Sequence, residues 1–177
     1  MKRNKERMVY IHNDYLVDEL IKTNNKDKRR KIVKDFLNKN FSGKPIAKNY
    51  SSGVILIKNT KTDTKHLLRN EHLDTSIALT QVVELIEKSD YISETAVDIK
   101  EKPASPNNYY WFFKVTICYE GKKFEYKLNI GRNKTDSHCS LYDITNNKKG
   151  ADSYRISNPG NNTPSKENIT NSVDKVK

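Results

Sequence analysis

The segment YYWFFKVTICYEGKKFEYKLNI (Tyr109–Ile130) carries the strongest structural signal in the sequence. Side chains alternate through both halves of the segment, and a period of two residues places alternate side chains on opposite faces of a β-strand. Glu120 and Gly121 separate the halves, and glycine tolerates the positive φ angles of tight hairpin turns. The segment therefore predicts an antiparallel hairpin. The two faces expected for its first strand are Tyr109, Trp111, Phe113, Val115, Ile117 and Tyr119 on one side, and Tyr110, Phe112, Lys114, Thr116 and Cys118 on the other.

Further strands are expected on either side of this hairpin. GVILIK (Gly53–Lys58) is a short apolar run after a glycine, and HCSLYDI (His138–Ile144) follows a polar loop. With the two strands of the hairpin, these segments predict a four-stranded antiparallel sheet. Tyr91–Ile99 is a candidate for a further short strand.

Helical periodicity covers three other segments. Tyr15–Lys22 and Asp27–Asn38 are predicted to be N-terminal helices, and Thr75–Lys88 is predicted to be the main helix. Continuing the helical wheel of this main helix backwards at 100° per residue places His72 within about 20° of Leu79, on the side expected to face the core. The predicted fold class is α+β, with N-terminal helices and one main helix packed on the sheet. The expected inward stripe is Leu79, Val82, Val83 and Ile86, and Leu85 is expected to widen it.

The charge of the 177-residue chain is unevenly distributed. The net charge is +11, and residues 1–40 hold 12 Lys and Arg against 6 Asp and Glu, whereas residues 41–145 hold 15 against 13. A strongly basic chain favours a polyanionic partner such as nucleic acid, although general solubility is an alternative. We expect three regions: a basic helical arm over residues 1–40, a folded domain over residues 41–147, and a disordered polar tail over residues 148–177.

Cysteine usage and hydropathy indicate a reducing compartment. Cys118 and Cys139 are the only cysteines, both fall in predicted strands, and buried free thiols are expected rather than a disulfide. No apolar run approaches the roughly 18 residues that a membrane span needs, and the basic N-terminus lacks the apolar core of a signal peptide. We expect a cytoplasmic protein without membrane association.

TDTKHLLRNEH (Thr62–His72) is the densest cluster of titratable groups. Cleavage of RNA by its own 2′-hydroxyl needs a base, an acid and a cation that stabilises the phosphorane, and it needs no metal. Histidine suits proton transfer near neutral pH, and lysine or arginine suits the charge. Lys65, His66, Arg69 and His72 supply such a set, although a solvated loop and first helical turn explain them equally well. No nucleotide-binding or metal-binding motif is evident, so no cofactor or metal is predicted.

Three further features admit a functional reading. His138, Ser140 and Tyr142 lie together on the last predicted strand and are candidates to complete a site, with an exposed loop histidine as the alternative. The run of aromatic residues at positions 109–112 is either a base-stacking platform or sheet core. The basic run KDKRRK at positions 26–31 either contacts phosphates or is a solvated helix start.

The order of these motifs resembles a known family. The first motifs along the chain are FSGKPI, GVILIK, the pair Lys65-His66, and His72 ahead of ALTQVVELIEKSDYI. The later motifs are KEKPASPNN, the aromatic strand, EGKKFEYKLNI and LYDI. This order is similar to that of the barnase–EndoU–colicin–RelE-like (BECR) nuclease domains of phage and mobile-element polyvalent proteins, in the large-polyvalent-protein-associated branch. The resemblance implies an α+β toxin-like fold and metal-independent RNA cleavage, with RNA as partner and tRNA as a candidate target. It carries over Lys65, His66 and His72, with Tyr142 added.

Two rival functions remain open. One is a non-catalytic protein-binding module, such as a phage-encoded inhibitor of a host defence protein, which would use the aromatic strand or the basic arm. The other is a nucleic-acid-binding protein that works through its arms and does not cleave. Catalysis by Lys65, His66 and His72 loses its support if these side chains point away from each other, so their arrangement in space distinguishes these functions.

Overall fold

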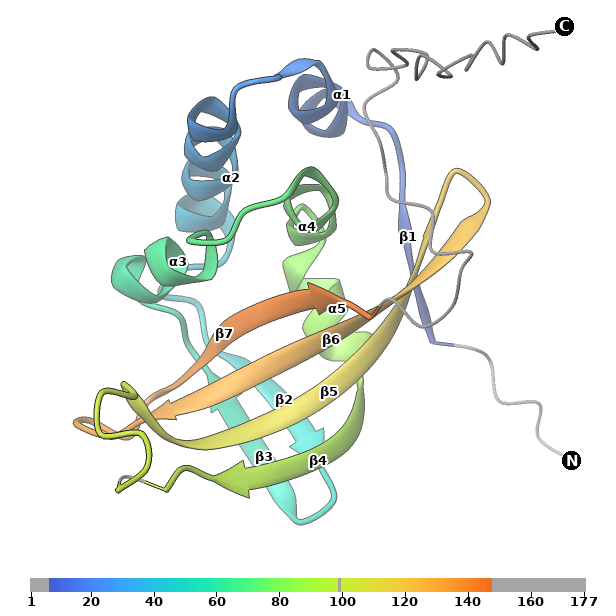
Figure 1. The fold of residues 1–177 in the computed structure, drawn as a ribbon. Coiled ribbons are helices and arrows are strands. Elements are labelled where there is room, and N and C mark those ends of the chain that lie inside the picture. Colours follow the sequence, from blue (N-terminus) through green and yellow to red (C-terminus); the bar gives the residue numbers. More distant parts are fainter. Residues whose placement is uncertain (1–6, 99, 148–177) are drawn as a thin grey trace, which may run out of the picture.

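The computed structural model describes residues 7–98 and 100–147. This part of the chain is α+β, which confirms the predicted class (Figure 1). The tail predicted over residues 148–177 lies outside the described residues. The helices are α1 (Tyr15–Lys22), α2 (Lys26–Asn40), α3 (Lys61–Leu67), α4 (Leu73–Leu79) and α5 (Val82–Lys88). The strands are β1 (Met8–Ile11), β2 (Ile46–Tyr50), β3 (Gly53–Ile57), β4 (Asp90–Ala96), β5 (Asn107–Tyr119), β6 (Lys122–Asn133) and β7 (Cys139–Asn146).

The sheet is larger than the sequence predicted. Strands β4 to β7 form an antiparallel series, as expected, but the described sheet has seven strands in the order β1-β5-β6-β7-β3-β2, with β4 also paired to β5. It is mixed, because β1 runs parallel to β5 and β3 runs parallel to β7. The prediction of four antiparallel strands is therefore wrong in detail. Strands β1 and β2 were missed because a strand of four or five residues is too short to show clear alternation.

The hairpin of β5 and β6 forms as predicted. Glu120 and Gly121 connect the strands with φ values of 49° and 74°, the positive pair that a type I′ turn requires. Phe113 and Ile117 are fully buried, whereas Phe112 is only partly buried. We call the side of β5–β7 to which Phe113 points the inner face and the side to which Phe112 points the outer face. The alternation of the sequence therefore corresponds to one buried and one accessible face.

The sheet curls so that its two ends approach each other. The ring of Tyr50 on β2 lies 5.9 Å from that of Tyr91 on β4 and 6.0 Å from that of Trp111 on β5, measured between centroids. Lys48 on β2 is buried, and its Nζ donates to the backbone oxygens of Glu87 (3.1 Å) and Ser89. These contacts close β2 onto the end of α5, so α5 is enclosed by the curl.

The predicted main helix is two short helices. Thr80 and Gln81 separate α4 from α5, and the Oγ1 of Thr80 donates to the backbone oxygen of Ile77 at 2.7 Å. A threonine hydroxyl that competes for a carbonyl of the preceding turn bends or interrupts a helix. Leu79, Val82 and Ile86 are buried as expected, and Leu85 is fully buried and widens the apolar face. Val83 is 37% exposed, so its place on the expected inward stripe is wrong.

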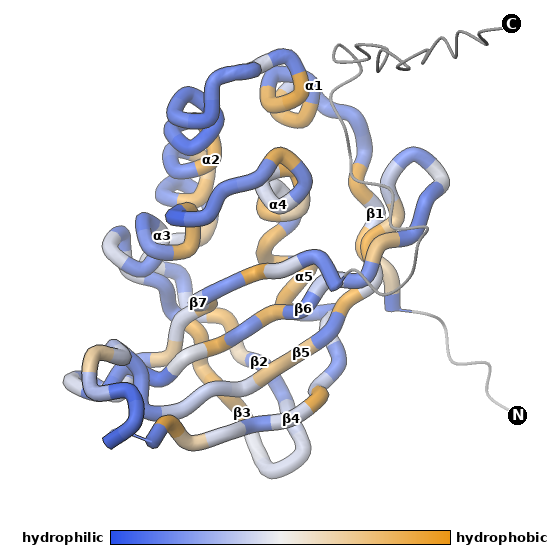
Figure 2. Tube along the Cα trace, viewed as in Figure 1, coloured by the Kyte–Doolittle hydropathy of each residue, from blue (hydrophilic) through white to orange (hydrophobic). Residues whose placement is uncertain are grey.

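The N-terminal segment belongs to the same core as the sheet. Val9 and Val17 are fully buried, and α1 and α2 begin at the caps Asp14 and Asn25, whose side chains accept from backbone N–H groups. Figure 2 shows that α2 is hydrophilic on its outer side and apolar on the side facing the other helices. The region predicted as a basic arm thus supplies a strand and two helices to the common core.

A buried ion pair joins α2 to α4. Arg29 Nε donates to Glu71 Oε1 at 3.0 Å, and the Glu71 side chain is fully buried. The same oxygen accepts from the Ser76 hydroxyl at 2.6 Å. Because a buried carboxylate is costly unless it is paired and hydrogen-bonded, this arrangement fixes the α3–α4 loop against α2.

The remaining expectations concern thiols and membranes. Cys118 and Cys139 are free and lie in strands, as predicted, but both are only partly buried rather than buried. Within the described ranges, no helix combines the length and the apolar composition that crossing a bilayer demands.

Candidate functional site

Helix α3 is held tightly against the start of β7. Asn59 is fully buried, and its side-chain amide pairs with both the N–H and the C=O of Leu141 at 2.8 and 3.0 Å. Thr60 and Asp63 then form a reciprocal capping box that begins the helix. Thr64 and Leu67 face the core, which leaves the opposite side of α3 exposed. The functional candidates of α3 lie on that exposed side.

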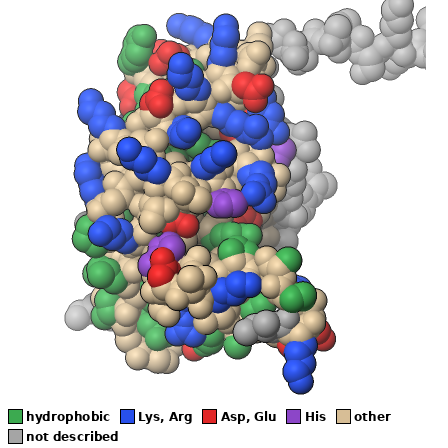
Figure 3. All heavy atoms as spheres, turned by 90° about the vertical axis from the view of Figure 1, so that its left-hand side faces the viewer, with side chains coloured by type: hydrophobic (Ala, Val, Ile, Leu, Met, Phe, Trp, Pro, Cys, Tyr) green, Lys and Arg blue, Asp and Glu red, His purple; other side chains and the backbone are tan. Residues whose placement is uncertain are grey.

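A cationic groove runs between α2 and α3. It has a volume of about 630 Å³, and Lys65, His66 and Arg69 line its α3 side. Figure 3 shows Lys and Arg side chains spread over this face of the molecule, with histidine where the helices meet the sheet. Five cationic side chains surround the groove against one carboxylate, so it favours a polyanion. The other lining residues are Arg30, Lys31, Lys34, Asp35, Thr62 and Leu68.

The cations of this groove differ in their partners. Arg30 is engaged with the protein itself, because its Nε donates to the backbone oxygen of Leu68 at 3.1 Å and its Nη2 donates to that of Arg69 at 2.5 Å. Lys31, Lys34 and Lys65 are exposed and form no ion pair within the described part of the chain. Arg30 therefore shapes the groove, and the lysines remain available for a ligand.

A second, smaller cavity adjoins the groove at His66. Its volume is about 100 Å³, and it brings His66 from α3 together with Tyr142 from β7. Thr62 and His66 line both spaces, so the cavity and the groove meet at these side chains. His66 thus lies where the cationic groove reaches the sheet. The cavity is also lined by Asp63, Pro106, Asn107, Asn133, Ser140 and Leu141.

Tyr142 is the second titratable group of this cavity. Burial raises the pKa of its hydroxyl, the neighbouring Tyr110 adds to the shift, and the positive charge of Arg69 opposes it. The ring of Tyr142 lies 5.5 Å from that of Tyr110, whose hydroxyl accepts from Asn107 Nδ2 at 3.2 Å. The Tyr142 hydroxyl is therefore protonated at neutral pH, as its ordinary pKa already implies, and it carries a proton that it can donate.

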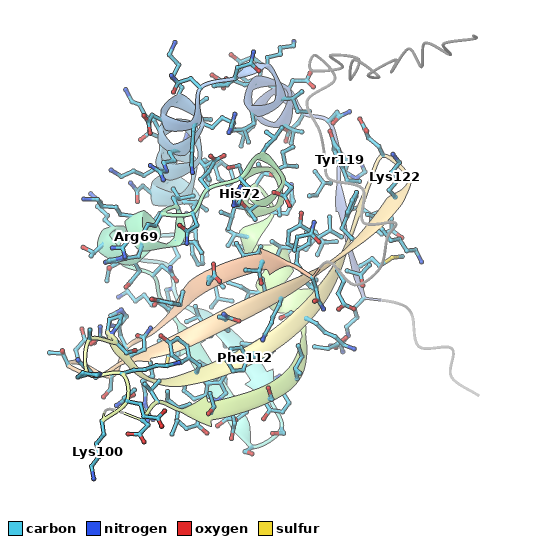
Figure 4. All side chains as sticks on the ribbon, viewed as in Figure 1. Arg69, His72, Lys100, Phe112, Tyr119 and Lys122 are labelled. Carbon is cyan, nitrogen blue, oxygen red and sulfur yellow. The ribbon has the colours of Figure 1, made fainter. Side chains whose placement is uncertain are left out.

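His72 lies outside both spaces. It is exposed at the N-cap of α4, and Thr75 Oγ1 bonds only its backbone N–H (3.2 Å) and C=O (2.9 Å). The expectation that His72 shares the buried stripe of Leu79 is wrong, because the helix begins after His72 and the wheel cannot be extended to it. Figure 4 shows His72 beyond Arg69, at the start of α4.

His138 forms a structural link. Its Nε2 lies 2.9 Å from Asp63 Oδ2 on α3, and its Nδ1 lies 2.5 Å from Asp136 Oδ1. Burial lowers the pKa of His138, but hydrogen bonds to Asp136 and Asp63 outweigh this effect and raise the pKa above 6.5. Both ring nitrogens are occupied, so His138 joins α3 to β7 and has no free nitrogen for proton transfer.

The structure thus brings Lys65, His66 and Arg69 together along one groove and Tyr142 to the adjoining cavity, and it leaves His72 apart. The expected set of Lys65, His66 and His72 therefore does not converge, and catalysis by that set loses its support. Sequence reasoning missed Lys34 and Asn107, which come from distant segments. The basic run at the start of α2 signalled cations there, but nothing local to it indicated that they face α3.

Comparison of the chain with protein-family models, with curated proteins and with solved structures finds no match. The fold and the side-chain geometry therefore carry the argument about function.

Proposed function

We propose that this protein is a metal-independent endoribonuclease of the BECR-like kind, of phage or mobile-element origin, that cleaves RNA through attack of a 2′-hydroxyl on the adjacent phosphate. The observation that carries the proposal is the meeting of His66 and Tyr142 at a small cavity that opens onto a groove lined by cations. The groove suits the phosphate backbone, and the cavity supplies two groups able to move protons.

The reaction assigns one task to each group. His66 accepts the proton of the 2′-hydroxyl, and the 2′-oxygen forms a bond to phosphorus while the bond from phosphorus to the 5′-oxygen breaks. Tyr142, whose hydroxyl is protonated at neutral pH, donates its proton to the leaving 5′-oxygen. Arg69 and Lys65 stabilise the charge on the phosphorane. The products carry a 2′,3′-cyclic phosphate and a 5′-hydroxyl.

Cleavage of total tRNA and of a generic RNA in EDTA, read on a denaturing gel, tests the proposal. Discrete fragments with 2′,3′-cyclic phosphate ends are expected from the wild type. The His66→Ala variant should cleave about 10² to 10⁴ times more slowly, as is usual when a general base is lost. His66 is exposed, so the variant should melt like the wild type.

His72→Ala is the matched control. It removes an exposed histidine only six positions further along the chain that lines neither space, and its cleavage rate should equal that of the wild type. Absence of cleavage by micromolar wild-type protein, or full activity of His66→Ala, would refute the proposal. Loss of activity in His72→Ala would move the site to the α3–α4 loop.

A further inference from the structure

A row of aromatic side chains lies on the outer face of the sheet, starting at the candidate site. The ring centroids of Tyr142 and Tyr110 are 5.5 Å apart, and those of Tyr110 and Phe112 are 6.4 Å apart. The rings of Tyr110 and Phe112 are nearly parallel, with an angle of 20° between their planes. All three side chains are only partly buried. The row thus leads from the cavity of His66 across β7, β6 and β5.

Core packing does not account for this row. The core aromatics of β5 are Trp111, Phe113 and Tyr119, which alternate onto the inner face and are at most 7% exposed. Figure 1 shows that α4 and α5 lie on the inner side and that no helix crosses the outer face of β5, β6 and β7. Figure 4 shows Phe112 near the middle of β5. Among the described residues, the half-buried aromatic side chains of this row therefore lie on a sheet face that no helix covers, which is typical of a binding surface.

Positive charge accompanies the row. Lys127 on β6 places its Nζ 4.2 Å from the centre of the Phe112 ring, and the exposed Lys114 lies on the same face of β5. At the other end, Arg69 is close enough to Tyr142 to oppose the rise of its pKa. Aromatic faces flanked by cations suit a chain that carries both planar bases and phosphates.

We propose that the outer face binds single-stranded RNA, with bases stacked on Phe112, Tyr110 and Tyr142 and the backbone continuing into the cationic groove. This deepens the proposed function, on which it rests, by naming the substrate class. Bases in a duplex are paired and stacked inside the helix, so they cannot reach a flat aromatic surface. Unpaired bases can, and stacking on aromatic side chains tolerates any sequence.

Fluorescence anisotropy with a labelled 2′-O-methyl RNA oligonucleotide tests the inference independently of cleavage, because this RNA lacks the attacking hydroxyl. The wild type should bind the single strand at least about tenfold more tightly than the same strand annealed to its complement. Phe112→Ala should weaken single-strand binding about tenfold, whereas Phe112→Trp, which keeps an aromatic face, should retain it. Tyr15→Ala removes an aromatic side chain that is 83% exposed on α1 and should have no effect.

The outcomes separate the two proposals. Equal affinity for single strand and duplex, or unchanged binding by Phe112→Ala, would overturn this inference even if EDTA-resistant cleavage by the wild type persists. Single-strand binding that depends on Phe112, without any cleavage of natural RNA, would support this inference and overturn the proposed catalysis. Absence of both binding and cleavage would overturn both proposals.

Discussion

The two faces of β5–β7 carry similar residues and differ in what covers them. On the inner face, Phe113 is fully buried, with the Tyr91 ring at 5.9 Å and Lys48 Nζ at 5.3 Å from its ring centre. On the outer face, Phe112 is one residue away in the chain, and its nearest aromatic partner is the half-buried Tyr110. An aromatic side chain of this sheet therefore contributes to stability where other elements cover it, and it is available for binding where its face is not covered.

Truncation of each phenylalanine gives the sharpest test of this comparison. Phe113→Ala should lower the free energy of unfolding by about 3–5 kcal/mol, because it leaves a cavity in a closed core. Phe112→Ala should lower it by less than about 1 kcal/mol, because its side chain is already partly solvated. Urea unfolding at fixed pH measures both. Equal losses would mean that the outer face is as well packed as the inner one.

Gly131 probes how tightly the outer face is packed next to the candidate cavity. A Cβ at this position would lie 2.4 Å from Asn107 Nδ2 and 3.1 Å from Tyr110 Cε1. Gly131→Ala should therefore displace Asn107, break its hydrogen bond to Tyr110, and cost about 1–3 kcal/mol. Thermal unfolding measures the loss. Gly53→Ala is a matched control within a strand, because its nearest contact would be 3.6 Å away.

The link made by His138 tests whether α3 needs support to present His66 to the sheet. Because the pKa of His138 is raised above 6.5 in the folded protein, its two ion pairs contribute fully below that value. Their contribution is lost as the pH rises through the raised pKa. At about pH 5.5, His138→Gln should be less stable than the wild type by up to about 1 kcal/mol, and the difference should shrink above about pH 8.

Urea unfolding at both pH values measures this effect. His12→Gln is the control, because His12 is exposed and has no carboxylate partner within the described ranges. A difference for His138→Gln that grows with pH would contradict the assignment of an imidazolium held between two carboxylates.

The smallest effect on stability is expected in the groove. Lys31→Gln combined with Lys34→Gln should change the free energy of unfolding by less than about 0.5 kcal/mol, because both side chains are exposed. The salt dependence of RNA binding should become less steep by about 0.7 per lost phosphate contact. Lys26→Gln combined with Lys28→Gln removes the same charge from the start of α2, outside the groove, and should leave the slope nearly unchanged.

The hairpin and the first two helices were predictable because local patterns specify them. Alternation predicted β5 and β6, and apolar periodicity predicted α1 and α2, whose caps Asp14 and Asn25 are seen in the structure. Strand β1 was not predictable, since it pairs with β5, far away in the sequence. Strand β2 pairs with the neighbouring β3, but its five residues are too few to show clear alternation. The break at Thr80 was also missed, because a threonine within a helical pattern is compatible with either a continuous or an interrupted helix.

The candidate site shows the same division. The sequence by itself determined which residue types cluster before α4, and that Phe112 and Phe113 face opposite ways. Only the tertiary structure decided that His66, rather than His72, meets Tyr142, and that Lys31 and Lys34 face α3. The physical reason is that local periodicity fixes which side chains share a face of an element, whereas the packing of distant elements decides which faces are covered and which meet.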